Sequence, residues 1–146
     1  MRVDAPDARA RFAAARVARM ATVGAGGRPH LVPVVFALEG DTVYTAVDDA
    51  KPKATLRLKR LANITANPAV ALLADHYEDD WNALWWVRAD GSARVIEPAD
   101  PEAARARELL AARYEQYRDA PPPGPVIAVA VERWSGWSAA GGAPRS

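Results

Sequence analysis

The chain has 146 residues, a length that suits one domain and lets it bury about two-thirds of the surface that its unfolded form exposes. Its 19 lysines and arginines are almost balanced by 18 aspartates and glutamates, and a net charge of +1 disfavours a general nucleic-acid-binding protein. The absence of cysteine excludes disulfides, thiolate metal sites and a cysteine nucleophile.

The first residues do not resemble a targeting segment. The stretch MRVDAPDARARF carries acidic residues and arginines where a signal peptide needs an apolar core. No apolar run approaches the ~20 residues of a membrane span. We therefore expect a cytoplasmic protein without a membrane partner, organised as a single domain over residues 1–146 with a frayed tail from about residue 139.

The first half of the chain predicts a helix followed by a meander of strands. Residues 6–18 are rich in Ala and Arg and contain an early proline, which suits a first helical turn, with Phe12 and Val17 facing inward. Two strands joined by the glycine turn GAGG come next, and a second turn at Gly40 leads to a third strand. These strands are expected at residues 20–23, 28–36 and 42–47.

The second half predicts two helices and four strands. A helix through LRLKRLANI should end at Asn67, and another should span residues 101–118. The run AVALLAD at residues 69–75 is nearly all apolar and predicts a strand buried on both faces. Residues 83–97 predict two strands with a turn or bulge at Asp90 and Gly91. The last strand is expected at residues 126–134.

Residues 51–60 read KPKATLRLKR, a strongly basic stretch in a chain of almost no net charge. The simplest interpretation is a solvated helix face. However, the lysines precede a helix, whose first N–H groups favour an anion. Lys53 and Arg57 are four residues apart and share a helical face. Because the preceding strand carries Tyr44 and Thr45, we interpret the stretch as a binding site for one phosphate group.

Several other features have a simple and a functional interpretation. GAGG is better explained as a hairpin turn than as a phosphate loop, because a strand pattern follows it. DHYEDD at residues 75–80 is better explained as a solvated acidic loop than as a calcium or other metal site. His30 could donate a proton or ligate haem, although a lone histidine usually does neither. Trp85 and Trp86 are adjacent on a strand, so they should point to opposite faces.

Three stretches, taken in order, resemble the pyridoxamine 5'-phosphate oxidase-like split β-barrel superfamily, and most closely its F-420-dependent oxidoreductase branch. They are ATVGAGGRPHLVPVVFAL, DTVYTAVDDAKPK and LRLKRLANITANPAVALLADHYEDDWNALWWVRADGSARV. The most telling parts are the strand HLVPV, the pair YT followed by KPK, the NP that opens the next strand, and the W-V-R strand. The likeness covers roughly residues 8–138.

This resemblance implies a mainly β fold with helices, a six-stranded antiparallel split β-barrel (FMN-binding split barrel). It also implies a homodimer with two cofactor sites at the subunit interface. The family's second strand lies along the cofactor ring, its YT pair and the following basic residues hold the cofactor phosphate, and its W-V-R strand approaches from the partner subunit. Mapped onto this chain, the expected cofactor-binding residues are Leu31, Val32, Pro33, Val34, Tyr44, Thr45, Lys51, Lys53, Arg57, Trp86 and Arg88.

The register within KPK leaves two choices for the main phosphate ligand. Counting without a gap from Tyr44 selects Lys51, whereas aligning on the downstream helix selects Lys53. Lys59 and Arg60 lie further along the helix and are expected to matter much less. At the other end of the chain, Trp134 and Trp137 flank a short Ser-Gly pair. At least one of them should pack near the interface or the ring pocket, and simple closure of the core is an equally good interpretation.

The departures from the family's namesake narrow the expected reaction. The C-terminal segment ERWSGWSAAGGAPRS lacks the arginine-and-histidine signature that binds pyridoxal phosphate, so vitamin B6 oxidation is rejected. The helix between KPK and NP is longer than in the oxidase, which favours the deazaflavin branch. We therefore expect an oxidoreductase that uses F-420 to transfer hydride to an electron-poor small molecule. An FMN oxidase or reductase, or a non-enzymatic carrier of flavin, F-420 or haem, remains an alternative.

No catalytic acid/base pair stands out in the sequence. The proton that completes the reduction would come from solvent or, with less support, from His30 or Tyr44. The substrate itself has no recognisable signature.

Overall fold

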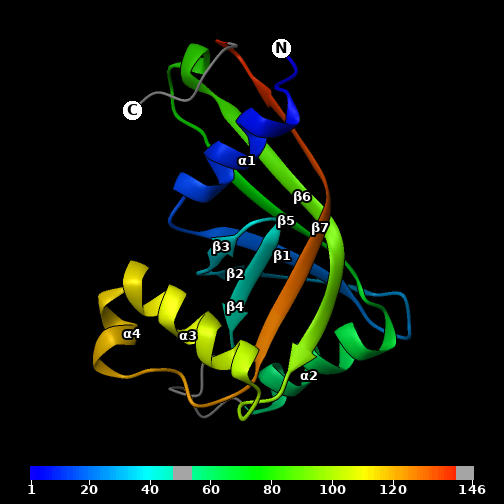
Figure 1. Ribbon diagram of the computed structural model, residues 1–146. Coiled ribbons are helices and arrows are strands. Elements are labelled where there is room, and N and C mark those ends of the chain that lie inside the picture. The colour runs from blue at the N-terminus through cyan, green and yellow to red at the C-terminus, as the bar shows by residue number, and fades with distance from the viewer. Residues whose placement is uncertain (48–53, 141–146) are drawn as a thin grey trace.

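The computed structural model describes residues 1–47 and 54–140, and for residues 54–58 it describes the backbone alone. Within this part of the chain, seven strands form one antiparallel sheet in the order β2-β1-β5-β6-β7-β4-β3 (Figure 1). The strands are β1 (Ala18–Val23), β2 (Pro29–Val34), β3 (Ala37–Glu39), β4 (Thr42–Ala46), β5 (Ala69–His76), β6 (Trp85–Ile96) and β7 (Val126–Ser138). The helices are α1 (Ala5–Ala14), α2 (Ala54–Ala66), α3 (Pro101–Arg113) and α4 (Glu115–Asp119), with a 3-10 turn, η1 (Trp81–Ala83).

The first helix begins at a side-chain cap and is shorter than its composition predicts. The Asp4 carboxylate accepts a hydrogen bond of 2.9 Å from the backbone N–H of Asp7. The helix ends where the N–H of Ala15 donates to the carbonyl of Phe12 at 3.1 Å. Phe12 is fully buried as expected, but the inward position predicted for Val17 is wrong, because Val17 follows the helix and is 41% exposed.

Glycine turns connect the early strands as the sequence predicts. Gly27, between β1 and β2, has a φ of +78°, and its N–H donates to the carbonyl of Gly24 at 3.0 Å. Gly40, between β3 and β4, has a φ of +60°. The short strand β3 was not predicted. The chain leaves β2 after Val34, so the strand expected at residues 28–36 is shorter than predicted, and β3 lies beyond its expected end.

Strand β5 alternates between a buried and a more exposed face, so the prediction that it is buried on both faces is wrong. Val70, Leu72 and Ala74 are buried, whereas Leu73 is only half-buried and Asp75 is exposed. Successive side chains of a strand point to opposite faces of the sheet, and only one face of β5 meets the core. The apolar run therefore places Leu73 on the outer face of the sheet.

Residues 85–96 form one continuous strand, with a bulge where the sequence allowed either a turn or a bulge. The pairing of β6 with β7 shifts between Asp90 and Gly91, because Asp90 pairs with Arg133 and Gly91 pairs with Val131. A Cβ atom on Gly91 would lie 2.3 Å from the carbonyl oxygen of Ala130. Glycine is therefore required for the close approach of the two strands.

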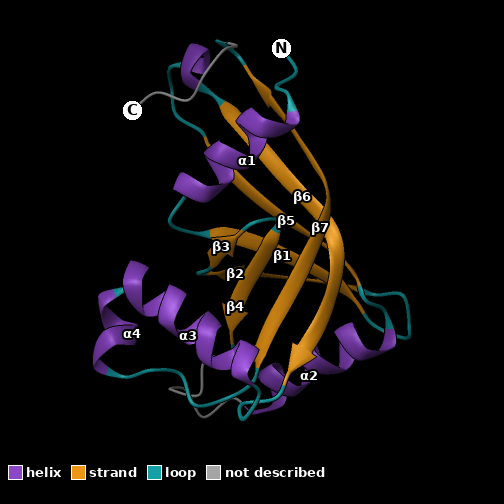
Figure 2. Ribbon diagram, viewed as in Figure 1, coloured by secondary structure: helices purple, strands orange, loops and turns teal. Residues whose placement is uncertain are grey.

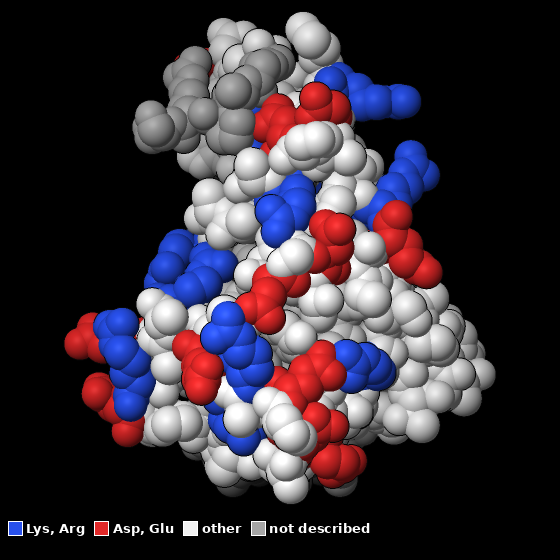
Figure 3. All heavy atoms as spheres, viewed as in Figure 1, with Lys and Arg blue, Asp and Glu red and all other residues white. Residues whose placement is uncertain are grey.

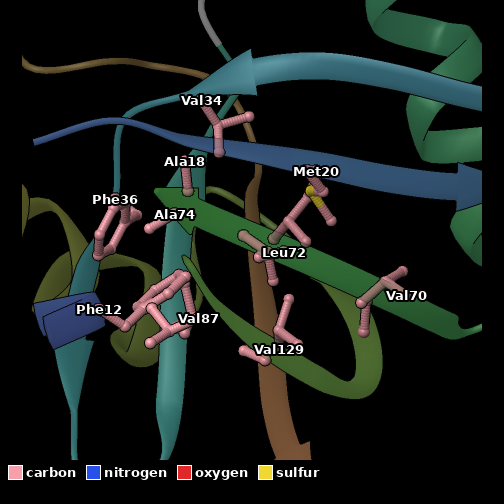
Figure 4. Close-up of a cluster of buried hydrophobic side chains, with 14 of the residues drawn as sticks. Phe12, Ala18, Met20, Val34, Phe36, Val70, Leu72, Ala74, Val87 and Val129 are labelled. Carbon is pink, nitrogen blue, oxygen red and sulfur yellow. The ribbon is translucent and has the colours of Figure 1, made fainter. Parts of the chain in front are cut away.

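The sheet curls around one main hydrophobic cluster (Figure 4). Helix α1 packs against β6 and β7, α2 against β1 and β6, and α3 against β3 and β4 (Figures 1 and 2). Labelled members of the cluster are Phe12, Ala18, Met20, Val34, Phe36, Val70, Leu72, Ala74, Val87 and Val129.

The helix predicted over residues 101–118 is divided at Tyr114 into α3 and α4. None of the helices in the described part of the chain is long and apolar enough to cross a membrane.

Candidate functional site: a pocket at the end of β2 and an outer strand face

Strand β2 divides the predicted ring-binding residues between two faces. Val34 is buried and Val32 packs against the main cluster. Leu31 and Pro33 point outward, and Leu31 is 67% exposed. Strand alternation therefore offers Leu31 and Pro33, rather than all four residues, to a ring lying on the outer face.

The YT pair is divided by the same alternation. The Tyr44 hydroxyl points toward α3 and donates a hydrogen bond of 2.8 Å to the Glu102 carboxylate. The Thr45 hydroxyl donates to the carbonyl oxygen of Val35 at 2.9 Å, and the side chain is almost fully buried. Both hydroxyl hydrogens are thus used within the chain, and Thr45 links β4 to the segment after β2.

A pocket of about 330 Å³ lies between the end of β2, the end of β4 and helices α2 and α4. Pro33, Val34, Thr45, Arg60 and Tyr117 are among the residues that line this pocket, which we call the β2 pocket. Burial lowers the pKa of Arg60 from its ordinary value. No carboxylate of the described chain forms an ion pair with Arg60, so its charge is available to an anion in the β2 pocket.

The structure describes only part of the basic stretch, residues 51–60. Lys51 and Lys53 lie outside the described residues, and for Arg57 the structure describes only a backbone position in the first turn of α2. Arg60, expected to matter little, is the cation that lines the β2 pocket among the side chains that the structure describes. A sequence signal for it existed, since Arg57 and Arg60 are three residues apart and lie near each other on a helical surface.

The predicted W-V-R strand lies on β6. Trp85 points inward, where the Arg11 guanidinium lies 5.5 Å from its ring centre. Trp86 points outward with Arg88, whose guanidinium lies 5.8 Å from the Trp86 ring centre. The expectation that the two tryptophans face opposite ways is confirmed. With residues of β5, Trp86 and Arg88 line a second pocket of about 350 Å³ on the outer face.

The remaining candidates do not join either pocket. His30 faces inward opposite Thr22, lines neither pocket, and its Nδ1 atom is buried without a hydrogen-bond partner among the described residues. The acidic loop is exposed as expected, with His76 bound to Glu78. The described residues contain no group of three His, Cys, Asp or Glu side chains that could hold a metal ion. Acidic and basic side chains are interspersed on the face seen in Figure 3.

Comparison with known proteins identifies the family. A family model described as pyridoxamine 5'-phosphate oxidase matches residues 5–138, nearly the whole chain. The chain belongs to this family. No curated protein matches it. The pyridoxamine 5'-phosphate oxidase fold is thereby confirmed, with one correction: the described sheet has seven strands rather than six, because β3 adds a strand of 3 residues.

Solved structures of the same fold come from several bacteria. An FAD-binding protein from Mesorhizobium loti is 18% identical, with a TM-score of 0.73, covering 93% of this chain and 95% of its own. The FAD-binding protein from Mycobacterium smegmatis is 17% identical, with a TM-score of 0.61, covering 94% and 96%. The haem storage protein HutZ from Vibrio cholerae is 17% identical, with a TM-score of 0.68, covering 94% and 95%. At these identities the likeness concerns the fold.

Proposed function

We propose that this pyridoxamine 5'-phosphate oxidase family member is an oxidoreductase that binds the deazaflavin F-420 and acts on an electron-poor small molecule. The observation that carries the proposal is the β2 pocket, where the Arg60 guanidinium lies beside an apolar strand end with no carboxylate partner in the described chain. A guanidinium in such a place favours a phosphate group. The neighbouring apolar surface suits a planar ring.

The chain's own residues would bind and orient this cofactor. Arg60 would hold the phosphate, and Lys51, Lys53 and Arg57 are proposed to join it from the start of α2. Thr45 acts indirectly, because its hydrogen bond to the Val35 carbonyl fixes the wall of the β2 pocket.

The ring would lie on the outer face of β2. Leu31 and Pro33 provide an apolar surface there and help to exclude water. When bound, the deazaflavin supplies the hydride, so the protein's contribution is position and a dry environment. No described side chain is assigned as the proton donor, and solvent is the proposed source.

We also propose a homodimer in the cytoplasm. Leu31 exposes a large apolar side chain on the outer face, and Pro33 is exposed beside it. A two-fold interface buries the same patch on both subunits. Trp86 and Arg88 would then face the cofactor that is held mainly by the partner subunit.

FMN is the second candidate cofactor. The FAD-binding proteins of similar fold favour a flavin in general, and the phosphate of FMN would suit Arg60 equally well. The length of the segment between KPK and NP favours F-420. A haem carrier is the third candidate, through the likeness to HutZ. Neither of the chain's two histidines lines the β2 pocket, which disfavours haem there.

The spectrum of the purified protein tests the cofactor. The chain is produced in a host that makes both F-420 and FMN, and its absorption is recorded without added ligand. A deazaflavin band supports the proposal, a flavin band selects FMN, and a Soret band selects haem. Reduced F-420 is then mixed with the protein and with quinones or activated alkenes. Failure of every such acceptor to accelerate F-420 oxidation would indicate a carrier rather than an enzyme.

A further inference from the structure

A third cleft, of about 350 Å³, lies along β6 and β7 near the amino-terminal residues. Trp86 on β6 pairs directly with Trp137 on β7, and Arg88 pairs with Ser135 in the same way. Residues directly opposite on antiparallel strands project to the same face. We define the arginine–tryptophan cleft by Arg2, Trp86, Arg88, Arg133, Ser135 and Trp137.

The charges in this cleft are unbalanced. The Arg88 guanidinium donates a hydrogen bond of 2.9 Å to the Asp90 carboxylate, so its charge is already paired. Arg2 and Arg133 form no ion pair with any residue of the described chain. Asp75, near Trp86, lies 3.6 Å from Arg19 and is also paired. Two guanidinium charges therefore remain available to a ligand.

The cleft also offers flat apolar surfaces and an unused hydroxyl. Trp137 is 36% exposed although it is a large aromatic residue. The Ser135 hydroxyl oxygen is buried and has no hydrogen-bond partner among the described residues. Buried polar atoms normally have a partner, so a hydroxyl of this kind indicates a ligand or an ordered water. A planar molecule with one anionic group would satisfy all of these features.

We propose that the arginine–tryptophan cleft binds the carboxylate or phosphate group of a planar small molecule. Arg2 and Arg133 neutralise the anion, the Ser135 hydroxyl donates to it, and Trp86 and Trp137 contact the ring. As a substrate subsite this assignment deepens the proposed function and rests on it, because Trp86 and Arg88 are proposed to face the partner's cofactor. The binding of the anion itself does not depend on a cofactor.

Intrinsic tryptophan fluorescence and calorimetry of the purified full chain test this proposal. The probes are benzoate, phenyl phosphate and the neutral analogue benzyl alcohol. We expect saturable binding of at least one anion and much weaker binding of the alcohol. Arg133→Gln and Arg2→Gln should each weaken anion binding about tenfold or more, since a charge-assisted hydrogen bond is lost. Arg118→Gln, on exposed helix α4, is the matched control.

Two outcomes overturn the proposal. One is the absence of saturable binding by both anions, and the other is an equal loss in the Arg118→Gln control. Comparison of benzoate with phenyl phosphate decides between a carboxylate and a phosphate ligand. Thermal unfolding of each variant establishes that it is folded. Arg2 lies outside the helices and strands, so Arg2→Gln tests the cleft even if Arg133→Gln fails to fold. F-420 and FMN are titrated into the same proteins as a separate measurement. Anion binding without cofactor binding would reject the proposed function but not the anion site.

Discussion

The Tyr44 hydroxyl and the Glu102 carboxylate are joined by a hydrogen bond of 2.8 Å, which connects strand β4 to the first turn of α3. Arg94 of β6 donates to the same carboxylate oxygen at 2.5 Å. The pair thus fixes α3 on the sheet, on the face opposite to Thr45. Phosphate binding by Tyr44 remains a prediction, whereas its contact with α3 is a described feature.

This contact predicts a stability change at high pH. Burial, helped by the hydrogen bond to Glu102, raises the pKa of Tyr44 from 10.0 to about 12. A raised pKa means that folding favours the neutral phenol, so its stabilisation is present below pH 10 and is lost as the pH rises toward 12. We expect the unfolding free energy, measured in urea, to fall more steeply over this range in the wild type than in Tyr44→Phe. Equal slopes would contradict the assignment.

Replacing Arg60 should weaken cofactor binding. Arg60→Gln removes the described guanidinium of the β2 pocket, and loss of a charge-assisted hydrogen bond costs roughly 1.5–3 kcal/mol, or about ten- to a hundredfold in affinity. Titration of F-420 and FMN into the purified variant measures the loss. Lys59→Gln changes the adjacent exposed cation and should have little effect.

Salt separates a specific contact from a general positive field. If Arg60→Gln and Lys59→Gln lose the same modest affinity for the cofactor, and the loss disappears at high salt, the basic stretch acts only as a diffuse positive field. Unchanged affinity in Arg60→Gln would place the phosphate elsewhere.

A charge on the outer face of β2 should break the proposed dimer. Leu31→Glu places a carboxylate where an apolar side chain is 67% exposed, and burying an unpaired charge in an interface is costly. Light scattering should give a dimer mass for the wild type and a monomer mass for the variant. Ala104→Glu, which adds the same charge to an exposed position of α3, should remain dimeric. A wild-type monomer, or a dimeric Leu31→Glu variant, would reject this interface.

The bulge between β6 and β7 should not tolerate a side chain on Gly91. Its Cβ would lie 2.3 Å from the Ala130 carbonyl oxygen, so Gly91→Ala must shift backbone and should destabilise the fold by about 1–3 kcal/mol. A Cβ on Gly26 would meet nothing within 4 Å, so Gly26→Ala should leave stability unchanged or slightly raised. Chemical denaturation of both variants measures the difference. Equal stabilities would show that the strands separate at little cost.

Local chemistry explains which elements could be predicted from the sequence. The first helix, with its early proline, and the glycine turns at Gly27 and Gly40 depend on nearby residues, and their patterns are visible in the chain. The short strand β3 depends instead on pairing with β4, which no local pattern indicates. The exposed face of β5 was missed for a similar reason, because an apolar run does not tell which face the rest of the chain will cover.

The sequence indicated which strands form the candidate site better than it indicated which side chains line it. Pro33 and Thr45 line the same pocket, but only the fold shows that Thr45 is hydrogen-bonded to Val35. Arg60 was set aside because of its distance along the helix from KPK. The path of α2 past the end of β2 brings it into the pocket, and that path is a tertiary property.

The bulge has a consequence for comparing this chain with its distant relatives. Glu132 is the extra residue of β7, and strand alternation changes sides at this point: Val129 and Val131 face inward before it, and Trp134 and Gly136 after it. If the strand alternated regularly through Glu132, without the bulge, Trp137 would face the core. At identities of 17–18%, an alignment that misplaces this single residue would equate inward positions of one protein with outward positions of another.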